Sequence, residues 1–269
     1  MTDRNAQFTG SIPAAYDRFL GPMLFEPYAD DLTARLTGPP TAAVLELACG
    51  TGILTGRLRR ALPASVTLTA TDLNEPMLAY ARAAVPDPGI TWRPADAVSL
   101  PFPDAAFDAV ACQFGLMFVP DKPRVFGEVR RALRLHGQFT FNVWLSLAEN
   151  PVGRIARDTI ARYFTSDPPT FYEVPFGFHD ESHIRGLLQA AHFDVVSCDR
   201  VVLEARSPSA HDAARGLVTG NPILLDIMER ATASPEEIIH AVAAALAAEG
   251  GGAPLRLPMR ALVFVARAV

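Results

Sequence analysis

The feature that most constrains this chain is an apolar segment, residues 44–48, that runs directly into a glycine-rich turn, Cys49-Gly50-Thr51-Gly52. The segment has the length of a buried strand, and the spacing of apolar residues over 53–62 predicts a helix just after the turn. Glycine in such a turn permits positive φ and lets a ligand approach the backbone closely. The unpaired N–H groups at the start of a helix suit a carboxylate or a phosphate. The segment therefore predicts a nucleotide-like ligand at the carboxyl edge of a parallel sheet.

The rest of the chain alternates between strand-like and helix-like segments. Expected strands cover residues 43–47, 66–71, 90–93, 107–112, 138–144, 195–203 and 260–265. Expected helices cover residues 26–36, 53–62, 76–84, 122–135, 152–164, 181–191, 210–217 and 235–248. Strands separated by helices at this spacing predict an α/β fold, a parallel sheet with helices on both faces.

Length and composition narrow the class of protein. With 269 residues, the chain is long enough for one large α/β domain with insertions. Its 49% hydrophobic and 20% charged residues are typical of a globular protein. A net charge of −5 without any basic run argues against a nucleic-acid partner, because binding a phosphate backbone requires clustered cations. No apolar stretch has the length of a membrane span, so we expect no membrane association.

The cysteines and the N-terminus give an expectation about the compartment. Cys49, Cys112 and Cys198 lie far apart and form no Cys-x-x-Cys pair, so neither a disulfide framework nor a zinc site is expected. Residues 1–10 are polar and lack the apolar core of a signal peptide. We therefore expect a cytoplasmic protein.

Two acidic positions follow the next two expected strands. Asp72 ends the second strand, 20 residues after Gly52, where a carboxylate accepts hydrogen bonds from ribose hydroxyls. Asp96-Ala97 lies just past the third strand and is followed by the segment Leu-Pro-Phe-Pro-Asp-Ala-Ala-Phe-Asp over 100–108. Both positions extend the ligand site that the glycine turn predicts.

Taken in order, three motifs resemble class I S-adenosylmethionine-dependent methyltransferases, most closely the type 11 branch with the ubiquinone- and menaquinone-biosynthesis enzymes. The resemblance covers about residues 45–144 and rests on Glu46 to Gly52, Asp72 to Leu78, and Asp96-Ala97 with Leu100 to Asp104. It implies S-adenosyl-L-methionine as the cofactor. It also implies a Rossmann-like, doubly wound, seven-stranded sheet whose last strand is antiparallel, with helical lid insertions. One departure is the turn before the fifth strand, which is Leu135-His136-Gly137 here and Pro-Gly-Gly in the family.

The resemblance also implies the residues of the cofactor site. In the family, the first-strand carboxylate and the glycine turn hold the methionine end, the second-strand carboxylate holds the ribose, and an Asp-Ala pair reads the adenine amino group. Apolar side chains flank the adenine, and residues past the fourth strand border the substrate pocket. The residues expected at the cofactor are Tyr16, Glu46, Ala48, Gly50, Gly52, Asp72, Leu73, Met77, Asp96, Ala97, Gln113 and Phe114.

From these inferences we expect methyl transfer to a small organic acceptor, as O- or C-methylation. The cofactor-binding core is expected at 41–145, 181–205 and 258–269, and a lid at 1–40 (an N-terminal helical segment), 146–180 (an insertion) and 206–257 (a helical substrate cap). The apolar make-up of the lid favours an apolar or aromatic acceptor. A general base is needed only if the acceptor loses a proton, and His179 is then the candidate, with His183 a weaker one. A homodimer stays open.

Simpler interpretations stand beside these. A carboxylate within residues 44–48 is costly to bury without a partner, which favours a functional Glu46 over a surface ion pair. Asp72 would alternatively cap a helix. Phe114 and Leu116 to Phe118 would alternatively be core. His179 and His183 lack the glutamate of a His-Glu-x-x-His zinc motif, since residue 180 is Asp, so we expect no metal and a helix cap at that residue.

Two other functions remain open at this stage. A nicotinamide-dependent oxidoreductase would share part of the glycine turn, but the third glycine, Gly56, falls one place late for the dinucleotide motif. A protein that binds S-adenosylmethionine without transferring its methyl group would share the whole cofactor site.

Overall fold

A computed structural model describes residues 4–36 and 42–269, and shows the expected seven-stranded sheet. The strands lie in the order β3-β2-β1-β4-β5-β7-β6. Strands β1 to β5 are mutually parallel, and β7 runs antiparallel to both β5 and β6. The expected fold class, including the antiparallel last strand, is therefore confirmed. The strands are β1 (Ala43–Leu47), β2 (Thr67–Asp72), β3 (Ile90–Pro94), β4 (Phe107–Gln113), β5 (Leu133–Trp144), β6 (Phe193–Ser207) and β7 (Leu255–Ala268).

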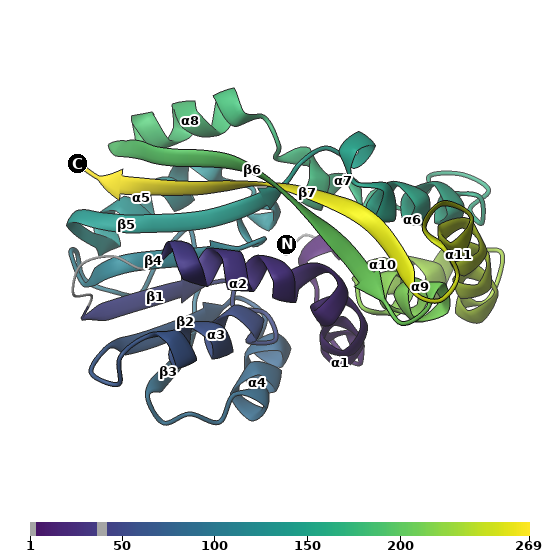
Figure 1. The fold of residues 1–269 in the computed structure, drawn as a ribbon, viewed down its shortest axis with the longest axis horizontal. Helices are drawn as coiled ribbons and strands as arrows, with labels where there is room; N and C mark the ends of the chain where they lie inside the picture. The colour runs from purple at the N-terminus through teal and green to yellow at the C-terminus, as the bar shows by residue number, and fades with distance from the viewer. Residues whose placement is uncertain (1–3, 37–41) are drawn as a thin grey trace.

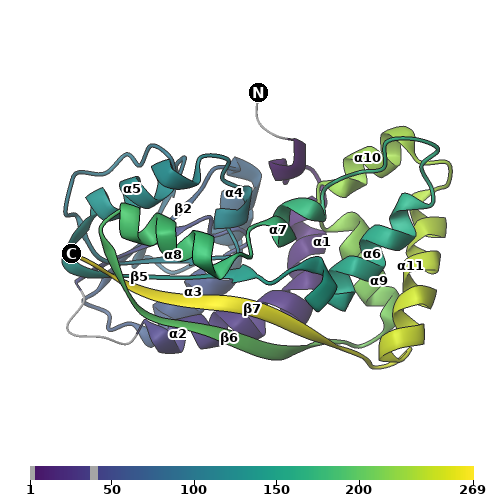
Figure 2. The ribbon, with the colours of Figure 1, turned by 90° about the horizontal axis from the view of Figure 1, so that it is seen from above.

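Helices cover both faces of the sheet, with α5 and α8 on one side and α2 and α3 on the other (Figure 2). The α-helices are α1 (Ile12–Ala15), α2 (Glu26–Arg35), α3 (Ile53–Ala61), α4 (Glu75–Ala84), α5 (Lys122–Ala132), α6 (Pro151–Ala161), α7 (Glu173–Gly177), α8 (Glu181–Ala190), α9 (Ala210–Thr219), α10 (Ile223–Arg230) and α11 (Pro235–Gly250). The other helices are the 3-10 turns η1 (Arg4–Ala6), η3 (Leu116–Phe118) and η4 (Leu147–Glu149), and the π-helix η2 (Tyr16–Phe25).

Each face of the sheet has its own hydrophobic core. One cluster joins α2 and α3 to the sheet and includes Leu32, Leu58 and Leu68, all nearly or fully buried. The larger cluster includes Phe126 of α5 and Phe139 of β5 and continues into the helices beyond the sheet. Burying each such side chain contributes about 1.5–3 kcal/mol. The strand tips between the two cores are therefore held in fixed relative positions.

A helical cap lies beyond the carboxyl end of the central strands. Strands β6 and β7 pair from Phe193↔Ala268 to Ser207↔Leu255, and their far halves extend past the sheet toward α6, α9, α10 and α11 (Figure 1). The helix α9 lies close to the π-helix at Gly216, where a Cβ would lie 2.7 Å from Cβ of Phe19. The helices α6, α9, α10 and α11 of the expected lid lie at this end of the molecule, whereas α2, within the expected N-terminal lid segment, packs on the sheet. Residues 1–3 and 37–41 lie outside the described residues.

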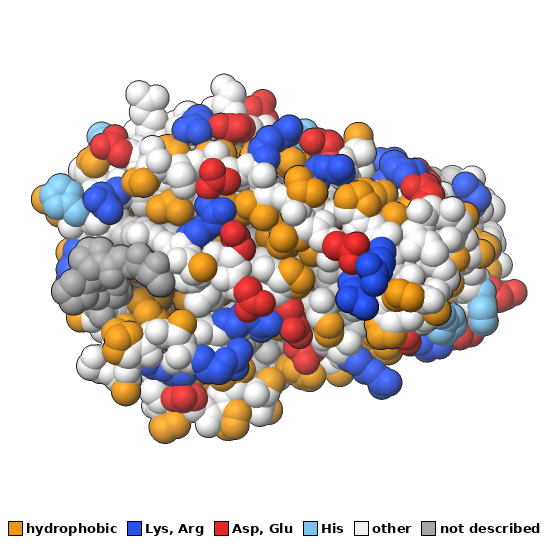
Figure 3. All heavy atoms as spheres, viewed as in Figure 1, with side chains coloured by type: hydrophobic (Ala, Val, Ile, Leu, Met, Phe, Trp, Pro, Cys, Tyr) orange, Lys and Arg blue, Asp and Glu red, His pale blue; other side chains and the backbone are white. Residues whose placement is uncertain are grey.

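The face formed by β6 and β7 intersperses acidic and basic side chains (Figure 3). Arg35 forms ion pairs with Asp31 and Asp199, and Arg200 pairs with Glu149 at 3.2 Å. Exposed pairs of this kind contribute about 0–1 kcal/mol each. These charges are therefore paired locally. Separately, no described helix is long and apolar enough to cross a membrane.

Several expected boundaries differ from the structure. The expected helix 122–135 ends at Ala132, because residues 133–135 already belong to β5, and the expected turn at 135–137 is a bulge inside that strand, where His136 adopts φ 64°. The helices α1, α7 and α10 and the π-helix were not expected. The strands β6 and β7 are longer than expected, to Ser207 and from Leu255, because they pair with each other into the cap.

Candidate cofactor and acceptor site

A cleft of about 810 Å³ opens at the carboxyl ends of β1, β2 and β4. It lies where a parallel sheet offers helix N-termini and strand tips to a ligand. The N-terminal segment 6–9, which lies in the expected lid, and the loop after η3, which was not expected at the site, also contribute to its walls. The structure brings most of the expected cofactor residues to this cleft, namely Tyr16, Ala48, Gly50, Asp72, Leu73, Met77, Asp96, Ala97, Gln113 and Phe114.

The two glycines of the turn have different surroundings. Gly50 has φ 55°, and a Cβ built there would meet nothing within 4 Å, so this part of the turn borders open space. Gly52 has φ 87°, and a Cβ there would lie 3.1 Å from Cβ of Ala81 in α4. Gly52 does not line the cleft. Gly50 therefore lines the cleft, whereas Gly52 allows the close packing of α3 against α4.

Asp72 connects the tips of β1 and β2. One carboxylate oxygen accepts the N–H of Gly50 at 2.9 Å, and the other accepts the N–H of Asn74 at 2.8 Å. Burial raises the pKa of this carboxyl above its ordinary value, and the two backbone N–H groups oppose that rise. Each carboxylate oxygen has more than one lone pair, so the side chain still has acceptor capacity toward the cleft. Asp72 thus holds the turn in place and keeps free acceptor capacity at the wall of the cleft.

Glu46 lies within β1 and is 1% exposed. Its Oε2 has no hydrogen-bond partner among the described residues. The side chain borders a hollow of about 30 Å³ whose other walls include Tyr16, Gly50 and Gln113. Burial raises the pKa of Glu46 to about 8, and the neighbouring Thr55 opposes this only in part.

An unpaired buried carboxylate oxygen of this kind is rare, because leaving it unpaired costs about 1–3 kcal/mol or more. The ammonium group at the methionine end of S-adenosylmethionine is a partner of the right charge. Gly50 and Gln113, which share the hollow, leave room for it. The residues present therefore fit the cofactor that the sequence implies.

The opposite end of the cleft suits an adenine. Leu73 is 53% exposed and lines the cleft together with the buried Met77. Asp96 accepts the N–H of Val98 at 3.1 Å, which fixes the loop after β3. Apolar side chains on one side and a carboxylate on the other match a flat base with a polar edge.

The tips of the two central strands carry an uncommon backbone conformation. Ala48, after β1, has φ 50°, and Phe114, after β4, has φ 49°. A Cβ at the adjacent Gly115 would lie only 2.5 Å from Cβ of Ala48, so the two tips are in close contact. Residues other than glycine rarely adopt positive φ, and those that do concentrate at functional sites. No pattern of residue types predicted this conformation.

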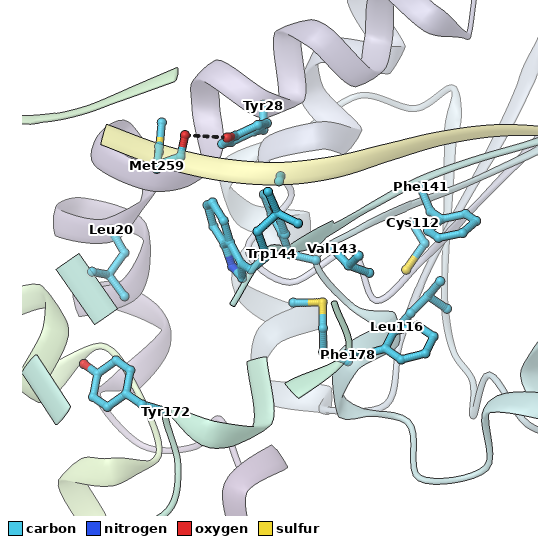
Figure 4. Close-up of a cluster of buried hydrophobic side chains, with 14 of the residues drawn as sticks. Leu20, Tyr28, Cys112, Leu116, Phe141, Val143, Trp144, Tyr172, Phe178 and Met259 are labelled. Atoms are coloured by element: carbon cyan, nitrogen blue, oxygen red, sulfur yellow. Dashed lines mark hydrogen bonds between the residues drawn. The ribbon is translucent and has the colours of Figure 1, made fainter. Parts of the chain in front are cut away.

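A second, apolar cavity of about 70 Å³ lies between the cleft and the helical cap. Its walls are largely aromatic: Phe25 stacks on Tyr16 with ring centroids 4.6 Å apart, and Trp144 stacks on Phe114 at 3.8 Å. Figure 4 shows Trp144 at the end of β5, with Leu20 and Tyr172 farther into the cap. Four side chains line both the cleft and this cavity, namely Phe8, Tyr16, Phe114 and Phe118.

The turn η3 forms part of the wall between the two spaces and is held by the only lysine of the chain. Lys122 donates to the carbonyl of Met117 at 2.9 Å and to that of Val119, and its Nζ lies 4.9 Å from the ring centroid of Phe178. Burial lowers the pKa of Lys122 to about 8. Within η3, Met117 and Phe118 line the apolar cavity, whereas Leu116 packs in the core.

The histidines lie outside both spaces. His179 does not line the cleft or the cavity, and its Nδ1 lies 2.7 Å from the carbonyl oxygen of Phe176. Asp180 caps α8 by accepting the N–H of His183 at 3.0 Å, as expected. The structure therefore does not bring His179 to the site. Within residues 4–36 and 42–269, no group of three or more His, Cys, Asp or Glu side chains is arranged to hold a metal ion.

Comparison with known sequences agrees with this geometry. The family model of a methyltransferase domain matches residues 45–141. Over 121 residues the chain is 37% identical to the ubiquinone/menaquinone biosynthesis C-methyltransferase UbiE of Hahella chejuensis, a match that covers 44% of this chain and 48% of that relative. The chain thus spans about half the length of this curated relative.

Comparison with solved structures supports the fold. A proposed methyltransferase of Bacillus halodurans matches with a TM-score of 0.60 at 17% identity, over 89% of this chain and 97% of that one. An S-adenosylmethionine-dependent methyltransferase of Mesorhizobium loti matches with a TM-score of 0.52 at 22% identity, over 88% of this chain and 96% of that one. The sheet order, the cleft residues and the matched domain agree, so residues 45–141 of this chain form a methyltransferase domain, with S-adenosylmethionine as its cofactor.

Proposed function

We propose that this protein transfers the methyl group of S-adenosylmethionine to a small apolar or aromatic acceptor, by O- or C-methylation. The observation that carries the proposal is the wall that the cofactor cleft shares with the aromatic cavity. An acceptor in the cavity would lie next to the cofactor, with side chains such as Tyr16 and Phe114 bordering both molecules. The name of the Hahella chejuensis relative, a quinone-biosynthesis C-methyltransferase, supports a ring-shaped acceptor.

In this proposal the residues of the cleft hold the cofactor at both ends. Glu46 pairs with the ammonium group, Asp72 accepts from the ribose hydroxyls, and Leu73 and Met77 flank the adenine beside Asp96. The bound cofactor supplies an electrophilic methyl carbon on a sulfonium. The aromatic walls orient the acceptor and exclude water, and positioning of this kind supplies up to about 7–11 kcal/mol in well-oriented reactions.

Proton transfer has a smaller part in this mechanism. Among the described residues, Tyr16 has a titratable side chain that lines both spaces. Burial raises its pKa above the ordinary value, and Asp72 and Asp17 raise it further. Tyr16 is therefore a neutral hydrogen-bond donor rather than a base. We assign no step to His179, because it lies outside both spaces.

We further propose that residues 4–36, 146–180 and 206–254 act as the lid over the acceptor. Ligand pockets typically have volumes of about 300–1,000 Å³, and the cavity has about 70 Å³. The walls of the cavity must therefore move apart to admit a ring.

We also propose that the partner is a small molecule rather than a nucleic acid, and that the protein acts in the cytoplasm, since its three cysteines are all free. Light scattering would decide whether it forms a homodimer.

The test is a methyl-transfer assay with product analysis. Purified protein with S-adenosylmethionine should form S-adenosylhomocysteine and a methylated product with phenols and quinols, and not with polar amines or carboxylates. Methylation of polar acceptors alone would refute the acceptor class. Binding of the cofactor without any product would favour a non-methylating protein, and binding of NADH in a fluorescence titration would favour an oxidoreductase.

A matched pair of variants tests the cofactor site itself. Asp72→Asn removes the charge that faces the cleft. We expect calorimetry to show about 100-fold weaker binding of S-adenosylhomocysteine, because two charge-assisted hydrogen bonds from the ribose hydroxyls would be lost. Asp87→Asn removes the same charge at an exposed position outside the cleft and should leave the affinity unchanged. Equal affinities of the two variants would contradict the assignment of Asp72.

A further inference from the structure

We infer that the indole N–H of Trp144 is the hydrogen-bond donor that selects acceptors carrying an oxygen atom on the ring. This inference rests on the proposed function, because it concerns the acceptor in the same cavity. It narrows the acceptor class from any apolar ring to a ring with a hydroxyl, carbonyl or ether oxygen.

Most polar side chains in the cavity wall already have hydrogen-bond partners within the protein. Asn150 donates to the backbone carbonyls of Leu145, Ser146 and Arg260 and accepts the N–H of Arg260. Its side chain is therefore fully used within the protein, and it offers nothing to a ligand.

The polar side chains at the cap end are also engaged. The hydroxyl of Tyr172 donates to the carbonyl of Leu217 at 2.8 Å, and Nδ2 of Asn221 donates to the same carbonyl at 3.2 Å. These two contacts satisfy the carbonyl of Leu217 near the end of α9. Their structural purpose is clear without a ligand.

Trp144 differs from these residues. Its side chain lines the cavity and the residue is 4% exposed. No hydrogen bond joins its Nε1 to a described residue, and this nitrogen is not among the fully buried atoms without a partner, so it keeps some accessible surface. In Figure 4 the indole nitrogen lies on the side of the ring that points away from β7. The indole N–H of a largely buried tryptophan usually finds a partner, and a ligand oxygen in the cavity would supply one here.

The position of Trp144 suits a role in selecting the acceptor. Its ring stacks on Phe114 at 3.8 Å and 8°, and Phe114 lines the cofactor cleft as well. A ring bound against Trp144 therefore lies one aromatic side chain away from the cofactor. Tyr16, whose hydroxyl also has no described partner, lines the cofactor cleft as well as the cavity.

The decisive experiment compares p-cresol with toluene, which have the same ring and differ in one oxygen. Binding is measured by calorimetry in the presence of S-adenosylhomocysteine. We expect the wild type to bind p-cresol about 10-fold more tightly than toluene, the effect of one hydrogen bond. In Trp144→Phe, which retains an aromatic ring to stack on Phe114, p-cresol should bind about 10-fold more weakly and toluene should be unaffected.

A control variant separates this effect from a general loss of packing. Phe176 lines the same cavity, with its ring centroid 6.1 Å from that of Trp144, and offers no hydrogen bond. Phe176→Leu should weaken p-cresol and toluene equally. The inference is overturned if Trp144→Phe also weakens both ligands equally, or if it leaves the preference for p-cresol intact.

A second measurement uses the wild-type protein and does not depend on any cavity variant folding. The chain has two tryptophans, Trp92 in β3 and Trp144, so its amide NMR spectrum contains two indole N–H signals, which Trp92→Phe assigns. The Trp144 signal should move downfield with p-cresol and not with toluene. Equal movement with both ligands, or none, would contradict the inference. Because neither measurement requires methyl transfer, a preference for p-cresol without any methylated product would overturn the proposed function alone.

Discussion

At the scale of single residues, the site depends on two carboxylates that the fold buries before any ligand arrives. Glu46 and Asp72 lie at the ends of adjacent strands, each nearly inaccessible, and the charge of Asp72 contributes to the raised pKa of Glu46. Sequence reasoning found both, because an acid inside an apolar strand and an acid at the next strand end are visible in the pattern. It could not separate Gly50 from Gly52, since only the packing of α4 shows which glycine faces the cleft.

The buried acid predicts a pH-dependent stability of the free protein. The pKa of Glu46 rises from its ordinary 4.5 to about 8 on folding, so stability from this group is complete below 4.5 and is lost as the pH rises through 8. Between these values it lowers the free energy of unfolding by up to about 1.4 kcal/mol per pH unit. In urea unfolding, Glu46→Gln should flatten this slope, and the exposed Glu204→Gln should retain it. Identical slopes in both variants would contradict the assignment.

The same group predicts that binding of the cofactor releases protons. At neutral pH the Glu46 carboxyl with a pKa of about 8 is mostly protonated, whereas pairing with an ammonium requires the carboxylate. Calorimetry of S-adenosylhomocysteine binding in buffers of different ionisation enthalpy should therefore show the release of close to one proton per site. Binding without proton exchange would mean that Glu46 does not meet the ammonium group.

At the scale of helices and strands, the sequence predicted the central elements well and the irregular ones poorly. The regular strands β1, β2 and β4 lie within a residue or two of their expected bounds, because β1 and β4 are largely apolar and β2 is rich in β-branched residues. The π-helix was missed because its wider turn follows neither helical nor strand periodicity. The bulge in β5 was read as a turn, since His136 and Gly137 interrupt the apolar pattern there.

Because α9 packs closely against the π-helix, we expect Gly→Ala substitutions in two helices to change stability in opposite directions, which helix propensity alone would not predict. A Cβ at Gly216 in α9 would lie 2.7 Å from Phe19, whereas at Gly186 in α8 it would meet nothing within 4 Å. Alanine is favoured over glycine inside a helix by about 1 kcal/mol. Gly186→Ala should therefore stabilise the protein by up to that amount, and Gly216→Ala should destabilise it by about 1–3 kcal/mol.

The measurement for this pair is denaturant unfolding, supported by cofactor affinity. Because the π-helix carries Tyr16 into the cleft, Gly216→Ala should also weaken binding of S-adenosylhomocysteine. A stabilising effect of both substitutions would show that the π-helix shifts freely away from α9.

At the scale of the whole molecule, a long ribbon of β6 and β7 joins a rigid sheet to a helical cap. Tyr28 of α2 fastens the ribbon, donating to the carbonyls of Val201 at 3.0 Å and Met259 at 3.1 Å. The resemblance predicted the core and the existence of a cap. It could not predict the walls of the acceptor cavity, because Phe8, Trp144 and Tyr172 come from distant segments that only the tertiary structure brings together.

This arrangement predicts which segments change their rate of hydrogen exchange when a ligand binds. Hydrogen exchange should slow in residues 16–25 and 114–121 when S-adenosylhomocysteine binds, because both segments contribute walls of the cleft. The helix α8 covers the other face and lines neither space, so its exchange should not change. Uniform slowing across the molecule would instead indicate a general gain in stability.

The single lysine has a practical consequence for work on this protein. Lys122 holds η3 beneath Phe178, and its lowered pKa leaves a larger share of its amine uncharged at mildly alkaline pH than an ordinary lysine has. Amine-selective reagents thus have one side-chain target in the whole chain. This target holds η3, which forms part of the wall between the cleft and the apolar cavity. A fluorophore attached there would convert the arrival of either ligand into an optical signal.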